Sequence, residues 1–231
     1  MKPYSIFLVR HGESIGNVDK SMYHTIPDWK IPLTEKGHQQ ALEAGKKFYK
    51  LLEVEKYWKE FKLYYPTSKP YRKLLQIYTS PWYRSRQTTQ GILLGLNMDS
   101  EIVKEDPRLR EQEWGNYQEL HIQDKIKRER HEYGSFFYRM PYGESGADVY
   151  DRVTSFMDTL YRDFEKEDFP LNVIISTHGL TIKIFLMRWF HWSVEEFEKY
   201  DTPDNCDIIQ MSLQNNGKYR QINQLKIYQD S

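Results

Sequence analysis

Apolar residues along the chain gather into short runs and into longer stretches with helical spacing. The short runs are rich in β-branched and aromatic residues, which is typical of buried strands. Three of them predict strands in the body of the chain: Ser5–Arg10, Leu74–Thr79 and Asn172–Thr177. Near the C-terminus, Asp207–Leu213 and Tyr219–Leu225 flank Asn215-Asn216-Gly217, a good hairpin turn.

Helical spacing of apolar residues fills the segments between these runs. Thr34 is a suitable N-cap, and Ala41 and Phe48 fall on one face of the helix that follows it. Helices are predicted over Thr34–Leu52, Arg84–Leu96, Glu119–Tyr133, Ser145–Phe164 and Gly179–Phe190. A loop is expected from Arg10 to Leu33. The stretch Glu55–Lys73, with Pro66 and Pro70, is expected to be irregular or partly helical.

Strands that alternate with helices predict the fold class. This order favours an α/β protein, a three-layer α/β/α sandwich around a largely parallel sheet. The chain has no linker-like tract and no repeat, so we expect one domain over residues 1–231. Within it we expect a helical or loop insertion at about 98–143 that caps the site.

Composition indicates which partners and which cellular compartment to expect. Lys plus Arg and Asp plus Glu number 33 each, so no net charge favours nucleic acid or a membrane surface. Cys206 is the single cysteine, which fits a reducing compartment and a small packed residue rather than a reactive thiol. No signal peptide opens the chain and no stretch reaches the length of a bilayer span. We therefore expect a cytoplasmic protein, either monomer or homodimer.

Two histidine-glycine pairs stand where predicted strands end. Arg10-His11-Gly12 follows the first strand, where ligands of open α/β sheets bind. The planar donor fork of Arg10 suits phosphate, and His11 is a candidate nucleophile. His178-Gly179 follows the strand Asn172–Thr177 and opens a helix, whose N-terminus favours an anion. Either pair alone is more often structural, whereas two at strand ends indicate phosphate chemistry.

Two further residues are candidates for the same site. Arg84 stands at the start of a helix just after the strand Leu74–Thr79, although Arg86 is its rival and an arginine on a helix face is solvated by default. Glu111 is a candidate proton donor. A lone glutamate in a charged loop is nearly always a surface residue. Glu111 is therefore a candidate only because the other three motifs, around His11, Arg84 and His178, occur in the same chain.

Six ordered blocks carry a resemblance to a known family. They are RHGESIGN (10–17), PLTEKGHQQA (32–41), TSPWYRSRQT (79–88), LREQEWGNYQ (109–118), YGESGADVYDRV (142–153) and STHGL (176–180). The chain resembles the histidine phosphatase superfamily, also called the phosphoglycerate mutase-like family. GESGADVYDRV and FLMRWF (185–190) are most similar to its subgroup of short phosphoglycerate mutase-like proteins.

The resemblance implies a role for each candidate. His11 attacks phosphorus and becomes phosphohistidine. Glu111 protonates the leaving oxygen and later deprotonates water. Arg10, Arg84 and His178 grip the phosphoryl oxygens, Asn17, Ser14 and Gly179 match positions near the phosphate, and Glu144 matches a position whose role varies across the family.

Elementary chemistry agrees with these roles. Charge on the phosphoryl oxygens makes positive donors the main source of catalysis. His11 must be neutral at its attacking nitrogen, and we expect its other nitrogen to donate to a carbonyl. Glu111 must carry a proton to act as an acid, so we expect hydrolysis to be best at mildly acidic pH. The chain has no HExxH and no CxxC, so we expect no metal.

Three functions stay open at this point. The chain is a phosphatase acting on a small phosphorylated metabolite or a broad set of phosphomonoesters, a phosphoglycerate mutase that needs 2,3-bisphosphoglycerate, or a weakly active phospho-ligand binder. The stretch Lys125–Glu132 interleaves basic and acidic residues, which favours a solvated face and hence a phosphatase over a mutase. Tyr133–Tyr142 either lines the pocket or packs as a cap, and the loop between Asn17 and Pro32 is a candidate for closing over substrate.

Overall fold

The computed structural model describes residues 2–64, 71–115 and 120–228 of the chain. The predictions that fall on Pro66, Pro70, residues 116–118 and the helix start at Glu119 lie outside these residues. The strands within the described residues are β1 (Ser5–Arg10), β2 (Leu75–Thr79), β3 (Val103–Glu105), β4 (Asn172–Thr177), β5 (Ile208–Leu213) and β6 (Tyr219–Gln221).

These strands form one sheet in the order β3-β2-β4-β1-β5-β6. β3, β2, β4 and β1 run parallel, while β5 is antiparallel to β1 and β6 to β5. The largely parallel sheet of the prediction is confirmed, with an antiparallel hairpin at one edge. Gly217 in the hairpin turn has a φ of 75°, the left-handed conformation that such a turn requires.

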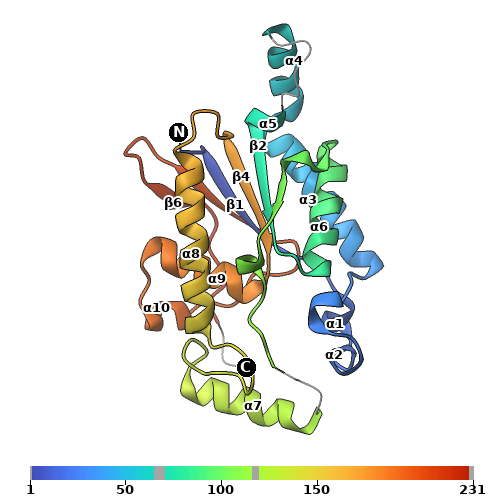
Figure 1. The fold of residues 1–231 in the computed structure, drawn as a ribbon, viewed down its shortest axis with the longest axis vertical. Helices are drawn as coiled ribbons and strands as arrows, with labels where there is room; N and C mark the ends of the chain where they lie inside the picture. Colours follow the sequence, from blue (N-terminus) through green and yellow to red (C-terminus); the bar gives the residue numbers. More distant parts are fainter. Residues whose placement is uncertain (1, 65–70, 116–119, 229–231) are drawn as a thin grey trace.

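Helices cover both faces of the sheet (Figure 1). α3 and α6 lie on one face and pack closely together, and α8 and α9 lie on the other. The α-helices of the described residues are α1 (Ile15–Val18), α2 (Met22–Thr25), α3 (Glu35–Leu51), α4 (Val54–Tyr64), α5 (Tyr71–Leu74), α6 (Tyr83–Leu96), α7 (Leu120–Tyr133), α8 (Gly146–Phe164), α9 (Gly179–Phe190) and α10 (Val194–Glu198). Three 3-10 turns join them: η1 (Asp28–Lys30), η2 (Ser100–Ile102) and η3 (Pro107–Leu109).

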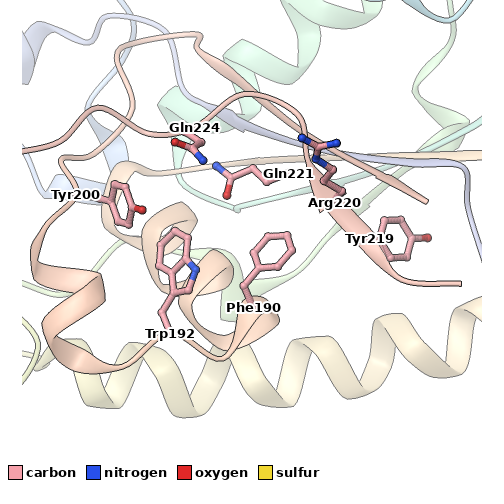
Figure 2. Close-up of a pocket in the computed structure, with 7 residues that line it drawn as sticks. All are labelled: Phe190, Trp192, Tyr200, Tyr219, Arg220, Gln221 and Gln224. Atoms are coloured by element: carbon pink, nitrogen blue, oxygen red, sulfur yellow. The ribbon is translucent and has the colours of Figure 1, made fainter. Parts of the chain in front are cut away.

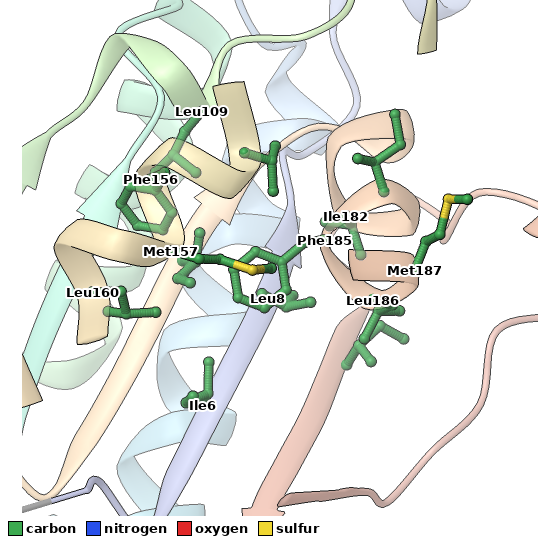
Figure 3. Packing of buried hydrophobic residues seen from close by; sticks show 14 of the residues in the cluster. Ile6, Leu8, Leu109, Phe156, Met157, Leu160, Ile182, Phe185, Leu186 and Met187 are labelled. Carbon is green, nitrogen blue, oxygen red and sulfur yellow. The ribbon is translucent and has the colours of Figure 1, made fainter. Parts of the chain in front are cut away.

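The central strand β1 divides its side chains between two hydrophobic layers. Ile6 and Leu8 pack with α8 and α9, whereas Phe7 and Val9 pack with α3 and α6. Figure 3 shows the first of these layers. This alternation follows from the period of two along a strand, and it explains why the run reads as continuously apolar.

The structure differs from the sequence prediction in the loop after β1 and at the end of the last strand. The expected loop from Arg10 to Leu33 contains α1, α2 and η1, which are too short to produce an apolar period. The second C-terminal strand ends at Gln221 rather than Leu225. Thr34 caps α3 as predicted, because its hydroxyl accepts the Gly37 N–H at 3.0 Å.

The segment predicted as an insertion contributes the strand β3 to the sheet and also forms the helix α7. β3 pairs with β2, whereas α7 lies beyond the carboxyl edge of the sheet (Figure 1). The stretch Tyr133–Tyr142 packs at the base of α7. Phe136 and Met140 are buried, and the ring of Phe136 lies 5.5 Å from that of Phe197 on α10. For these two residues the packed alternative is the correct one.

Candidate active site

The parallel strands bring three loops together at one edge of the sheet. Arg10 at the end of β1 pairs with Thr177 at the end of β4, and Thr79 at the end of β2 pairs with Ser176. The His11 N–H donates to the Thr177 carbonyl at 2.9 Å, and the Ser80 N–H donates to Ser176 at 3.0 Å. His11 and His178 consequently lie side by side, with ring centres 5.2 Å apart.

His11 is held in the tautomer that a nucleophile needs. Its Nδ1 lies 2.7 Å from the Gly12 carbonyl, which can only accept, so Nδ1 carries the proton and Nε2 the lone pair. Burial lowers the pKa of His11 well below its usual value, and the charges of Arg84 and Arg10 lower it further. Nε2 therefore stays unprotonated.

His178 offers a second nitrogen to the same space. Its Nε2 lies 2.8 Å from the Ser80 hydroxyl, whose oxygen also accepts the Trp82 N–H. A Ser80 hydroxyl that donates to Nε2 leaves the proton of His178 on Nδ1. That buried atom has no hydrogen-bond partner among the described residues. Burial, followed by the charge of Arg84, lowers the pKa of His178 well below its usual value.

Two arginines supply positive charge beside His11. Nε of the buried Arg84 donates to Nε2 of His11 at 3.2 Å, and its guanidinium lies 4.7 Å from the centre of the Trp82 ring. Nη1 of Arg10 donates to the Pro203 carbonyl at 2.6 Å, while its buried Nε has no partner in the described chain. Unpaired N–H groups on Arg10 and His178 suit an anion bound against His11.

Glu111 lies at the start of α9, close to these groups. The Leu180 N–H donates to one carboxylate oxygen at 3.3 Å, and the Thr181 hydroxyl to the other at 3.2 Å. These donors fix the carboxylate beside the loop that carries His178. The role of Glu111 in proton transfer, which the resemblance implies, stays a prediction.

The remaining predicted residues surround this centre. The Asn17 side-chain oxygen accepts from the Ser14 N–H and hydroxyl, both at 3.0 Å, and from Asn205 at 3.2 Å. Ser14 is thus turned toward Asn17 as part of a capping box. Gly179 is the first residue of α9, and a Cβ there would come within 3.0 Å of Thr202. Arg86, the rival of Arg84, forms an exposed ion pair with Glu105.

Two glycines allow the loop after β1 to lie against α3. A Cβ on Gly12 would lie 2.5 Å from the Gly37 carbonyl oxygen, and one on Gly37 would lie 2.1 Å from that of Glu13. No side chain fits at such separations. The close approach presses the His11 loop onto the start of α3.

An ion network supports the Glu111 loop from behind. Buried Arg152 on α8 donates to the carbonyl oxygens of Arg108, Arg110 and Glu111 at 2.6 to 3.1 Å. It also donates to both oxygens of Glu144, which accepts from Arg110 as well. The Glu144 carboxylate thus joins Arg152 and Arg110 behind the Glu111 loop. Sequence reasoning missed Arg152, although it falls in the block GESGADVYDRV.

Three more residues near the site escaped the sequence analysis. Asp28 in η1 forms an ion pair with Arg84 at 2.8 Å, and Tyr23 on α2 is largely buried beside the same charges. Arg130 on α7 donates to buried Gln112 at 3.3 Å and lies 5.0 Å from the Trp114 ring centre. The expectation that Lys125–Glu132 is a solvated face is thus wrong at Arg130, because the helix turns that position toward the Glu111 loop.

Cys206 behaves as the packed residue that was predicted. Its N–H donates to the Arg10 carbonyl at 3.1 Å, and burial raises the pKa of its thiol to about 12. A thiol with so high a pKa is protonated at neutral pH and is a poor nucleophile.

A separate cavity lies away from this centre. It measures about 330 Å³ and is lined by aromatic and amide side chains (Figure 2). Phe190, one of its lining residues, ends α9 at the opposite end from His178. Neither His11 nor His178 lines this cavity.

Comparison with known proteins agrees with the geometry. Residues 6–58 and 68–224 match the sequence profile of the histidine phosphatase superfamily (branch 1). The chain belongs to this superfamily. It is 41% identical to phosphoglycerate mutase-like protein AT74H of Arabidopsis thaliana over 95% of the chain and 77% of that protein. It is 32% identical to broad-range acid phosphatase DET1 of Saccharomyces cerevisiae, over 92% of the chain and 86% of the yeast protein.

A solved structure shows that the fold is shared at low identity. The mycobacterial glucosyl-3-phosphoglycerate phosphatase superposes with a TM-score of 0.70 at 20% identity, covering 96% of the chain and 98% of that protein. As a member of this superfamily, the chain is an enzyme. Among the described residues, no helix combines the length and apolar content needed to cross a bilayer.

Proposed function

We propose that this protein hydrolyses phosphomonoesters through a phosphohistidine formed on His11. The observation that carries the proposal is the neutral, buried His11 Nε2, held beside Arg84 and His178 with its other nitrogen committed to the Gly12 carbonyl. A neutral nitrogen that accepts from Arg84, near the unpaired N–H groups of Arg10 and His178, is complementary to an electrophilic phosphorus that carries negative oxygens.

The proposed reaction has two balanced steps. His11 Nε2 attacks phosphorus, the bond from phosphorus to the leaving oxygen breaks, and Glu111 gives its proton to that oxygen. The Glu111 carboxylate then takes a proton from water, whose oxygen attacks phosphorus while the bond from phosphorus to Nε2 breaks. Inorganic phosphate leaves, and both residues return to their first state.

The finer features of the proposal follow from the chemistry of the site. We propose a small phosphorylated substrate, in keeping with the superfamily to which the chain belongs and with Asp28, which lies against Arg84 at the site. His11 serves as the nucleophile, so the scheme uses neither a metal nor an organic cofactor. A cytoplasmic location, a monomer or homodimer, and the absence of a nucleic-acid partner remain predictions from the sequence.

Phosphorus NMR tests the proposal in a single tube. Purified protein is mixed with 3-phosphoglycerate, a trace of 2,3-bisphosphoglycerate and an aryl phosphate. We expect inorganic phosphate to grow at the expense of the esters. Growth of 2-phosphoglycerate without released phosphate would make the enzyme a mutase instead.

Trapping of the intermediate completes the test. Acid-labile phosphate should attach to the wild type and to His38→Ala, whose exposed α3 histidine serves as the control, but not to His11→Ala. Hydrolysis that persists in His11→Ala would contradict the assignment of the nucleophile.

A further inference from the structure

The turn η1 is hydrogen-bonded to Arg84, the arginine that contacts His11. Arg84 Nη1 donates both to the Asp28 backbone carbonyl at 2.7 Å and to the Asp28 carboxylate at 2.8 Å. The Arg84 side chain is only 4% exposed and that of Asp28 27% exposed, so water screens the pair weakly. Residues 56 positions apart in sequence thus share one guanidinium.

This contact places a carboxylate at the edge of a site built for an anion. The Arg84 guanidinium reaches His11 through Nε and Asp28 through Nη1, so a bound phosphoryl group and the Asp28 carboxylate would share its charge. Two anions on one cation repel each other, and the repulsion is strong where water is scarce.

Charged groups on several elements affect the pKa of Asp28. Burial raises the pKa of Asp28, the Arg84 charge and hydrogen bond on α6 lower it, and Glu111 and Glu113 raise it. Tyr23 on α2 faces the same charges, and its own pKa is raised, chiefly by burial. Lys30 in η1 lies against the Trp29 ring.

We propose that Asp28 is a positioning residue whose proton controls phosphate binding: ionised, it holds Arg84 and opposes the substrate, and protonated, it keeps the hold without the opposing charge. The proposal rests on the proposed function, because it assumes that phosphate binds at Arg84. The hold survives protonation because the Asp28 backbone carbonyl still accepts from Nη1, and a neutral carboxyl group still offers a carbonyl oxygen.

The sign of the pH effect follows from this arrangement. The pKa of Asp28 is raised, so protons bind to it at a higher pH than to an ordinary aspartate. Lowering the pH through that pKa removes one negative charge from the pocket. Anions should therefore bind more tightly in acid, which adds to the acid requirement of Glu111.

Sulfate is the probe for a first test, because it stays a dianion from pH 4 to pH 8 while phosphate does not. Its dissociation constant is measured over this range for the wild type, for Asp28→Asn and for Glu35→Gln, an exposed carboxylate on α3, as control. We expect Asp28→Asn to bind sulfate about tenfold more tightly than the wild type at pH 7. We expect its pH dependence to be much flatter, whereas Glu35→Gln should follow the wild type.

The wild type alone provides a second test that needs no variant. Binding linkage is reciprocal, so sulfate must raise the pKa of Asp28 if Asp28 protonation favours sulfate. Carbon NMR of labelled aspartate carboxyl groups measures that pKa with and without sulfate. An upward shift supports the proposal, and an unchanged or lowered pKa overturns it.

The experiments distinguish failure of the Asp28 proposal from failure of the phosphate site itself. Sulfate that binds and competes with substrate, but equally in wild type and Asp28→Asn at every pH, overturns the role of Asp28 alone. Sulfate that does not bind the wild type, together with no labelling of His11, overturns the phosphate site itself.

Discussion

Lys183 is buried and Arg130 is half-buried, and both carry positive charge. Within the described chain, neither forms an ion pair, and Arg130 Nε is buried without a hydrogen-bond partner. Lys183 on α9 lies 4.0 Å from the Phe197 ring centre, and burial lowers its pKa to about 8. The Arg130 charge also lowers the pKa of Lys183, whereas the Glu198 charge raises the pKa of both residues and the Glu111 charge raises that of Arg130. We predict that a second anionic group on a substrate reaches Arg130, whose side chain binds Gln112 next to Glu111.

At this residue scale we expect Arg130→Met to discriminate between substrates. For a phosphoester with a second anionic group, KM should rise about tenfold or more in this variant. The reason is that a weakly screened charge pair contributes at least about 1.4 kcal/mol to binding. An aryl phosphate without that group should change little. Steady-state kinetics on both substrates measures the effect, with exposed Arg128→Met on the same helix as control. An equal rise of KM for both substrates would show that Arg130 stabilises α7 and does not contact the second anionic group.

At the scale of elements, the start of α3 shapes the nucleophile loop. Thr34 caps the helix and also reaches back to Glu13, whose carbonyl accepts the Thr34 N–H at 2.9 Å. Lys36 pairs with the Glu13 carboxylate at 2.7 Å. With Gly37 pressed against the same residue, the helix and the loop form one unit. The position of His11 therefore depends on a helix that begins more than twenty residues later in the chain.

We expect Gly37→Ala to damage both stability and catalysis. The added methyl must displace the Glu13 backbone, which costs about 1–3 kcal/mol of unfolding free energy. A displaced His11 should lower kcat/KM at least about tenfold. Chemical denaturation and kinetics test this, with Gln39→Ala on the exposed side of α3 as control. Wild-type activity in Gly37→Ala would show that the loop moves independently of the helix.

At the scale of the whole molecule, the site makes the fold sensitive to acid. His11 and His178 are buried and neutral, whereas in the unfolded chain each binds a proton near pH 6.5. Because the unfolded state then binds more protons, stability rises with pH and is lost as the pH falls below about 6.5. The acid conditions that we propose favour catalysis thus weaken the fold that holds the site.

We expect each histidine to account for about 2 kcal/mol of the stability lost between pH 8 and pH 5. Urea unfolding of the wild type and of His178→Asn at both pH values measures this contribution. The variant should lose about 2 kcal/mol less than the wild type over the same interval. An identical loss in the two proteins would mean that His178 is already protonated in the folded state at pH 5.

The amino-acid sequence alone determined the periodic and local features of this protein. Strands such as Ser5–Arg10 were predictable because their apolar runs are local, and His11 and His178 were predictable because each directly follows a strand. The cap of α3 by Thr34 depends on a residue only three positions away. Such signals depend on the chain within a few residues, so a pattern suffices to find them.

The tertiary structure decided which distant side chains meet. Asp28 reaches Arg84 across 56 positions, and Arg152 reaches the Glu111 carbonyl across 41. Arg130 belongs to a stretch of mixed charge that looks solvated, and only the placement of α7 turns it toward Gln112. Charge and polarity at these positions are ordinary for a surface. They become part of the site because packing of the sheet and helices removes water and brings their partners within hydrogen-bond distance.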